Sequence, residues 1–312
     1  MRHDAYGTSD RPDWRSIDWR SARREAIVDG RRLSYLDRGE GSPIVLVHGT
    51  GGCWQNWLET IGPLSLHHRV FALDLPGFGD SEMPLERISI EGYADTVLAL
   101  SEQLELQAPA LIGHSLGGMF VAEAARRGPG DVGAVVMVGG TAVTLLELAR
   151  RPWTAVRRPN VALAIAGEIT AGVRRSPDWL QRAAVTRARL RTLSFWYVLD
   201  RPDRIAKDVL WELASGAGRR GYLSAVAAHR RHRLPSTLDL ACPQMIVHGE
   251  RDRLVTSRDL DVFAARAPSA DVVRVPYAGH MPHLEAPRQF NDIVLSFLRR
   301  HDQAAYTNGG GA

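Results

Sequence analysis

Three side chains with the chemistry of a nucleophile, a carboxylate and a base stand in this chain order: Ser115, Asp252 and His280. A serine hydroxyl becomes a strong nucleophile when an imidazole accepts its proton, and a carboxylate orients that imidazole and stabilises its charged form. Such a set transfers an acyl group to the serine and then to water. The three residues are far apart in sequence, so the fold must bring them together.

Ser115 lies in the stretch Gly-His-Ser-Leu-Gly-Gly, residues 113–118. The apolar residues 109–112 before it predict a short buried strand, and residues 116–127 after it predict a helix. A sharp strand-to-helix turn projects a serine hydroxyl outward, and glycines two positions before and after the serine avoid clashes across that turn. This pattern predicts that Ser115 is a nucleophile rather than an incidental serine in a glycine-rich turn.

The carboxylate has three candidates near the predicted strand 245–247. We prefer Asp252, which follows that strand closely. Glu250 stands in the same loop, and Asp259 lies farther along, in a predicted helix. A loop charge or a helix cap is the alternative explanation for each of them.

The base has two candidates after the predicted strand 271–275. We prefer His280, which directly follows Gly279 at the end of that strand and would pass the serine proton to the leaving group. His283 is the rival, for which a surface or helix-start position is the simpler expectation.

An alternation of strands and helices is predicted to position these residues. The turn signal Asp29-Gly30 indicates a hairpin between the first two strands. Strands are predicted at 25–28, 32–37, 44–47, 70–73, 109–112, 134–138, 245–247 and 271–275, and helices at 54–64, 90–104, 116–127, 257–266 and 287–300. This order predicts an α/β fold with a mostly parallel central sheet flanked by helices. Sites in such sheets form at the carboxyl ends of the strands, where all three candidate residues fall.

Three segments depart from the alternation. Residues 1–24 are expected to form a polar, poorly ordered arm, and residues 301–312 a flexible tail. Residues 141–238 lack strand signals and are expected to form a helical cap, or lid, between core parts 25–140 and 239–300. Some aromatic residues of this cap are expected to line an apolar substrate pocket, the candidates being Trp153, Trp179, Phe195, Trp196, Tyr197 and Trp211.

The composition indicates an ordinary globular protein, with 312 residues of which 45% are hydrophobic and 24% charged. No apolar run approaches the length of about 18 residues that a membrane span needs. The first residues lack a stretch of signal-peptide type, so we expect a cytoplasmic protein. Cys53 and Cys242 are the only cysteines, without metal-ligand spacing, and are expected to be plain thiols.

The charge is unevenly distributed along the chain. Residues 141–235 contain 17 arginines, one lysine and seven acidic residues, so this segment is near +11 although the whole chain is +4. A basic surface attracts acidic or carrier-bound substrates. We favour the simpler interpretation of a solvated arginine-rich face. No nucleic-acid-binding motif accompanies the charge, so nucleic acid is not an expected partner.

The chain resembles the α/β-hydrolase superfamily, in its capped serine-hydrolase branch. The resemblance covers roughly residues 25–140 and 239–300. It rests on four motifs in the expected order: His-Gly-Thr-Gly-Gly at 48–52, Asp-Leu-Pro-Gly-Phe-Gly-Asp-Ser at 74–81, the serine turn, and the pair of Gly-x-x-Asp at 249–252 with Gly-His at 279–280. The 74–79 motif is also similar to that of carbon–carbon bond hydrolases of the ring-cleavage type, which usually carry a residue other than histidine before the nucleophile.

The resemblance implies an oxyanion hole made by the backbone N–H groups of Leu116 and Thr50, with Gly51 as the alternative to Thr50. It implies structural roles for His48 and Asp74. A substrate pocket is expected at Gly51, Trp54, His114, Trp196 and Met281.

The function predicted from these observations is hydrolysis of a carboxylic ester or thioester of a small, largely apolar substrate. Neither a metal nor an organic cofactor is implied. A lyase, a cofactor-free perhydrolase or a C–C bond cleaving enzyme on the same three residues is the alternative. A second alternative is a biosynthetic accessory or binding protein whose catalytic site has decayed. The identity of the acyl group stays open.

Overall fold

The computed structural model describes residues 6–84, 88–140, 151, 153, 156, 159–173, 177–216, 221–232 and 235–309. Eight strands form one sheet in the order β1-β2-β4-β3-β5-β6-β7-β8. The strands are β1 (Arg23–Val28), β2 (Arg31–Arg38), β3 (Pro43–Val47), β4 (Arg69–Leu73), β5 (Ala110–His114), β6 (Ala134–Val138), β7 (Gln244–Gly249) and β8 (Asp271–Val275). The predicted α/β fold is confirmed, and the strand ends differ from the predicted ones by a few residues.

The first two strands form the predicted hairpin. Strand β2 runs antiparallel to both β1 and β4, while β3 to β8 pair in parallel with their neighbours. Asp29 and Gly30 turn the chain between β1 and β2 with φ angles of 51° and 70°. This left-handed conformation matches the twist of a two-residue hairpin turn.

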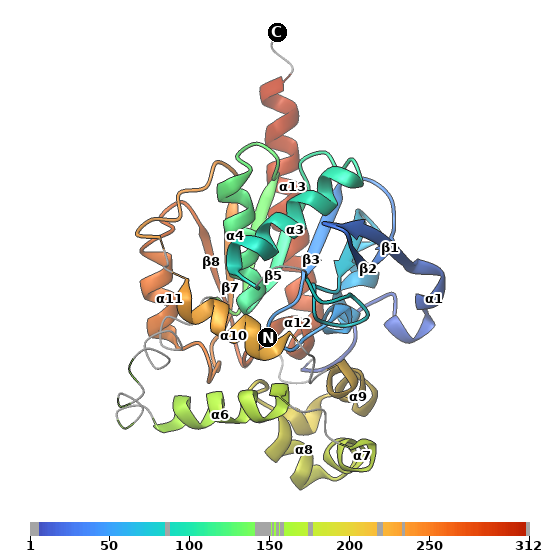
Figure 1. Ribbon diagram of the computed structural model, residues 1–312, viewed down its shortest axis with the longest axis vertical. Coiled ribbons are helices and arrows are strands. Elements are labelled where there is room, and N and C mark those ends of the chain that lie inside the picture. The colour runs from blue at the N-terminus through green and yellow to red at the C-terminus, as the bar shows by residue number, and fades with distance from the viewer. Residues whose placement is uncertain are drawn as a thin grey trace.

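Helices cover both faces of the sheet (Figure 1). Side chains of α3 (Ile90–Gln103), α4 (Leu116–Arg127) and α11 (Ser257–Ala264) pack on one face, together with strand residues such as Val45 and Leu111. Side chains of α2 (Leu58–Leu64) and α13 (Pro287–Gly309) pack on the other face with the alternate strand residues, such as Leu46 and Ile112. Because both faces are covered, the central strands β3 and β6 contain only apolar residues, which made them visible as continuous apolar runs.

Between β6 and β7 the chain leaves the sheet and forms helices only, within the described residues. They are α6 (Pro159–Val173), α7 (Asp178–Thr186), α8 (Ala188–Phe195), η5 (Pro202–Arg204), α9 (Lys207–Gly216) and α10 (Tyr222–Arg231). We call residues 141–238 the insertion. In Figure 1, α6 to α9 lie together beyond one end of the sheet, and α13 extends past the other end.

The N-terminal segment is not a loose arm, so that prediction is wrong for residues 6–22. This segment contains η2 (Trp14–Ser16) and α1 (Trp19–Ala22). Ser9 donates a hydrogen bond to Glu59 at 2.7 Å, and Arg15 forms a bidentate ion pair with Asp208 of α9. These specific pairings order a segment that a polar composition alone marks as disordered.

At the other end of the chain, helix α13 continues to Gly309, so residues 301–309 are helical rather than a tail without structure.

No helix in the described part of the chain combines the length and apolar character that crossing a lipid bilayer requires.

Candidate active site

Ser115 stands at the turn from β5 into α4, in a strained backbone conformation with φ 53° and ψ −123°. Its N–H donates to the Val138 carbonyl at 2.7 Å, which holds the turn against β6. A Cβ atom on Gly113 would collide with the Gly117 carbonyl oxygen, and one on Gly117 would lie 2.5 Å from the Val47 carbonyl. The glycines therefore permit the close approach that this turn requires.

Asp252 and His280 are in direct contact. The Nδ1 atom of His280 donates to Oδ2 of Asp252 at 2.7 Å, and both side chains are almost completely buried. The other oxygen of Asp252, Oδ1, accepts the N–H groups of Leu254 and Val255 at 2.8 and 2.9 Å. With its proton on Nδ1, the neutral His280 ring carries on Nε2 the electron pair that accepts a proton, as a general base needs.

The competing residues occupy other positions. Glu250 is exposed in the loop after β7. Asp259 binds Thr256 in a capping box at the start of α11. His283, in α12 (Pro282–Glu285), is buried, and its ring centroid lies 4.7 Å from that of Trp57. Burial lowers the pKa of His283 to about 3. His283 stands at the start of a helix, as one of the two expectations had it, but it is not at the surface, because its ring belongs to the core.

A cavity of about 1170 Å³ opens between the carboxyl ends of the strands and the insertion. Both Ser115 and His280 line it, with loop residues 49–52 after β3. Most of the remaining lining is apolar and comes from the insertion, including Leu163, Ala166, Leu180, Ala184, Leu190, Leu193, Phe195, Trp196, Tyr197, Val198 and Leu213. The candidate nucleophile and the candidate base therefore face one largely apolar space.

Four of the five predicted pocket residues line this cavity: Gly51, His114, Trp196 and Met281. Trp54 is not among the lining residues, and that prediction is corrected. Trp54 lies in η3 (Trp54–Trp57) and packs in the core, with its ring centroid 5.3 Å from that of Trp19.

The aromatic residues of the insertion lie at the cavity, at the surface or, for Trp211, partly buried against a core cluster. Phe195, Trp196 and Tyr197 line the cavity. The side chains of Trp153 and Trp179 are each 69% exposed. Trp211 packs against the Arg182 guanidinium, 5.2 Å from the ring centroid.

Tyr222 of α10 also lines the cavity, beside Gly51, and was not predicted from the sequence. No motif marks it, because its place in the wall depends on how α10 packs against the loop after β3.

The oxyanion site was predicted at the backbone N–H groups of Leu116 and Thr50. Leu116 begins α4 directly after Ser115, with its side chain in the core, and Thr50 lines the cavity. A Cβ atom on Gly49 would lie 2.8 Å from the Cβ of Ser115, so the loop after β3 approaches the serine closely. These positions agree with an oxyanion site but leave the roles of both N–H groups as predictions.

His114 holds the loop that carries His280. Its Nε2–H donates to the His280 carbonyl oxygen at 3.0 Å, and burial keeps its pKa well below the usual value. His114 is therefore neutral at physiological pH. The sequence predicted a pocket position for His114 but gave no sign of this contact.

His48 and Asp74 fix the loops beneath the site. His48 Nδ1–H donates to the Gly49 carbonyl at 2.7 Å, and its Nε2 accepts the Leu75 N–H at 3.0 Å. Asp74 accepts the N–H groups of Trp54 and Asp80, both at 2.9 Å. Burial lowers the pKa of His48 to about 4 and raises that of Asp74 to about 6.

The arginine-rich insertion is described in part. Arg150, Arg157, Arg158, Arg174, Arg175, Arg219, Arg220 and Arg233 lie outside the described residues. Among the described arginines, Arg189 of α8 lines the cavity. In the described ranges, no group of three or more histidine, cysteine, aspartate or glutamate side chains is placed to hold a metal ion.

Comparisons with known proteins agree with this architecture. A family model of the alpha/beta hydrolase fold matches residues 42–287. The dihydrolipoyllysine-residue acetyltransferase component of the acetoin cleaving system of Pseudomonas putida is 31% identical over 288 residues, covering 90% of this chain and 70% of that protein. The 2-hydroxymuconate semialdehyde hydrolase of a Pseudomonas species is 27% identical over 301 residues, covering 90% of this chain and 95% of that protein.

The fold is also similar to that of solved structures. A malate-bound thermophilic esterase from Thermogutta terrifontis matches with a TM-score of 0.68 and 20% identity, over 89% of this chain and 98% of that chain. This likeness concerns the arrangement of the strands and helices.

Proposed function

The chain belongs to the alpha/beta hydrolase family, and on this premise we propose that it cleaves a carboxylic ester or thioester through an acyl-enzyme on Ser115. The observation that carries the proposal is the pairing of His280 with Asp252 at 2.7 Å, in a cavity wall that His280 shares with Ser115. The strained turn at Ser115 supports it, because strain of this kind persists where the fold holds a residue in a working position.

In this mechanism His280 accepts the hydroxyl proton of Ser115 while the serine oxygen attacks the acyl carbon. The negative charge that develops on the acyl oxygen is stabilised by the Thr50 and Leu116 N–H groups, at about 3 kcal/mol for each donor. His280 then donates the proton to the departing alcohol or thiol. Water, activated in the same way by His280, attacks the acyl-enzyme and releases the acid.

The cavity supports an apolar acyl group larger than acetyl. Its volume of about 1170 Å³ exceeds the usual size of small-molecule pockets, about 300–1,000 Å³. Each methylene of the acyl chain that is buried against the apolar cavity wall contributes about 0.8 kcal/mol to the binding free energy, which is about fourfold in the binding constant.

We therefore expect kcat/KM for p-nitrophenyl esters to rise from acetate to octanoate. Ala184→Phe narrows the cavity, because Ala184 of α7 lines it, and should lower kcat/KM for octanoate far more than for acetate. The same change at exposed Ala188, outside the lining, is the matched control. A flat chain-length series would contradict an apolar acyl site, and no turnover of any ester or thioester would remove the proposed function.

A second candidate is cleavage of a carbon–carbon bond in a ring-cleavage product. It is favoured by the 27% identical 2-hydroxymuconate semialdehyde hydrolase and by Arg189, whose guanidinium could pair with a substrate carboxylate at the cavity. Turnover of 2-hydroxymuconate semialdehyde above that of every ester tested would decide for this candidate.

The role of Asp252 gives a separate test. In Asp252→Asn, the amide oxygen should keep the two N–H donors of Leu254 and Val255, and the NH₂ group would then face His280. His280 Nδ1 must become an acceptor, so the proton moves to Nε2, where it blocks base catalysis. We expect kcat to fall by about 10⁴ with the fold intact. Glu250→Gln, in the same loop, should stay within a few-fold of the parent, and greater damage there would transfer the role to Glu250.

A further inference from the structure

Glu285, at the end of α12, accepts hydrogen bonds from the N–H groups of the two residues that flank His280. Its Oε1 atom accepts the Gly279 N–H at 2.8 Å and the Met281 N–H at 3.3 Å, and its side chain is buried. A Cβ atom on Gly279 would lie 3.0 Å from Oε1, so the carboxylate approaches this backbone closely. One carboxylate oxygen therefore binds the backbone of this loop on both sides of His280.

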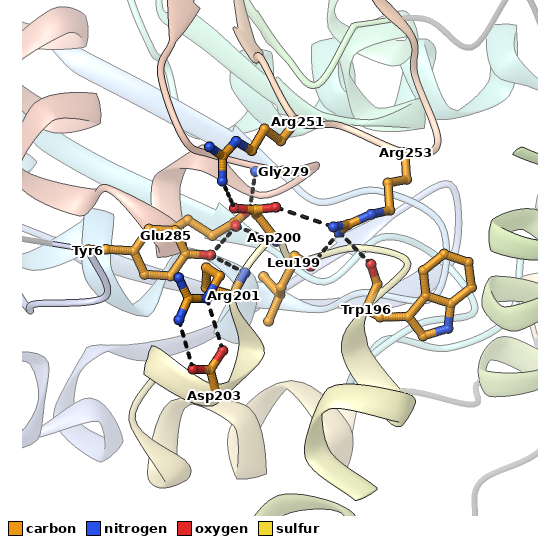
Figure 2. A network of polar contacts seen from close by, with 10 residues as sticks. All are labelled: Tyr6, Trp196, Leu199, Asp200, Arg201, Asp203, Arg251, Arg253, Gly279 and Glu285. Atoms are coloured by element: carbon orange, nitrogen blue, oxygen red, sulfur yellow. Dashed lines mark hydrogen bonds and ion pairs between the residues drawn. The ribbon is translucent and has the colours of Figure 1, made fainter. Parts of the chain in front are cut away.

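The other oxygen of Glu285 binds two further segments of the chain (Figure 2). Oε2 accepts the Asp200 N–H at 2.7 Å and also the Tyr6 hydroxyl. The Tyr6 oxygen in turn accepts the Arg201 N–H at 2.8 Å. The N-terminal segment, the insertion and the His280 loop thus converge on a single side chain.

The same part of the insertion contacts the residues on either side of Asp252. Asp200 pairs with Arg251 at 2.8 Å and with Arg253 at 3.2 Å (Figure 2). Arg253 also donates to the carbonyl oxygens of Trp196 and Leu199, at 2.8 and 3.0 Å. Both loops that carry the Asp252–His280 pair are therefore bound to residues 196–201.

Residues 196–201 also form part of the substrate cavity. Trp196, Tyr197 and Val198 line it, and the Val198 carbonyl accepts the His280 N–H at 2.9 Å. A movement of this segment would shift the cavity wall and the His280 loop together.

The carboxylate of Glu285 is costly to bury, and this cost argues for a specific role. Burial raises the pKa of Glu285 to about 7, because a buried anion loses its hydration. Four donors offset that loss, two on each oxygen. A glutamine would present an acceptor on one side only, and an apolar side chain would leave the donors of Gly279, Met281 and Asp200 without this acceptor.

We propose that Glu285 is a positioning residue for His280, and that it fixes the His280 loop against residues 196–201 and Tyr6. The proposal deepens the proposed function, because it takes His280 as the base. Glu285 does not touch the reacting atoms. It acts through the N–H groups of the two residues that flank His280, and the ion pairs of Asp200 extend the same fixation to the loop of Asp252.

The test compares Glu285→Ala and Glu285→Gln with Glu59→Gln. Glu59 of α2 is the matched control, since it is another buried carboxyl that binds the N-terminal segment, at Ser9, and it lies outside the cavity lining. We expect Glu285→Ala to lower ester kcat about 100-fold, as a displacement near 1 Å of a reacting group does. Glu285→Gln keeps an acceptor for the two N–H groups beside His280 and should recover about tenfold of that loss. Glu59→Gln should retain the parent kcat.

The second readout is the NMR signal of the His280 Nδ1 proton, identified by its loss in His280→Ala. This signal should shift or broaden in Glu285→Ala and stay unchanged in Glu59→Gln, and it does not require that the protein hydrolyse an ester. Absence of ester turnover in the parent would therefore count against the function, while the proton signal still tests the positioning. If Glu285→Ala does not fold, Glu285→Gln decides in its place. A folded Glu285 variant with the parent kcat and an unchanged Nδ1 signal would overturn the proposal.

Discussion

Replacing Ser115 with alanine is expected to lower ester kcat by about 10⁶ and to abolish covalent labelling by a fluorophosphonate. The three residues act as a unit, so removal of the nucleophile loses nearly all of their contribution. A residual rate above that in water should remain, since Thr50 and Leu116 would still bind the oxyanion. Intact-mass spectrometry after labelling and initial-rate kinetics measure the two effects.

Ser101→Ala is the matched control for Ser115→Ala. Ser101 is buried on α3, where its hydroxyl donates to the Val97 carbonyl at 2.8 Å, and it lies outside the cavity lining. This variant should be labelled like the parent. Activity of Ser115→Ala within about tenfold of the parent would refute the assignment of the nucleophile.

Replacing His280 with alanine should be almost as damaging, with a loss of kcat of about 10⁶. Without the imidazole, the hydroxyl of Ser115 keeps its proton, and Asp252 is left buried beside an empty site. The labelling rate should fall in parallel with kcat, because the fluorophosphonate reacts with the activated serine. His67→Ala, at an exposed position after α2, should change neither rate.

His283→Ala separates the two neighbouring histidines. The ring of His283 packs on Trp57 in the core, so its removal should cost about 3 kcal/mol of unfolding free energy and leave kcat of the folded protein near that of the parent. Thermal unfolding measures the loss of stability. The kcat values of His283→Ala and the parent are compared at a temperature where both proteins are folded. The opposite result would assign the base to His283.

Most of the sheet was predictable because its signals are local. Strands covered on both faces are apolar at every position, so 44–47 and 134–138 appeared as uninterrupted apolar runs. Helices α3 and α4 followed from their spacing of apolar residues. Since parallel strands place their carboxyl ends at one edge, the order of the strands was enough to assign the loops with Ser115, Asp252 and His280 to a common edge.

The contacts of the N-terminal segment could not be predicted in this way. Tyr6 and Glu285 are 279 positions apart and meet through a single hydrogen bond between side chains. A lone polar pair has no periodicity and little effect on local composition. The polar character of residues 6–22 was therefore correctly observed but led to the wrong expectation of a loose arm.

The sequence by itself determined the fold class, the order of the strands and helices, and the positions of the candidate nucleophile, acid and base. These follow from backbone turns and burial patterns, which act over a few neighbouring residues. The tertiary structure alone decided that His280 meets Asp252 while His283 enters the core, and that Tyr222 rather than Trp54 faces the cavity. Those outcomes depend on the direction of each side chain after distant elements pack together, and that direction is set by dense packing between surfaces that are remote in sequence.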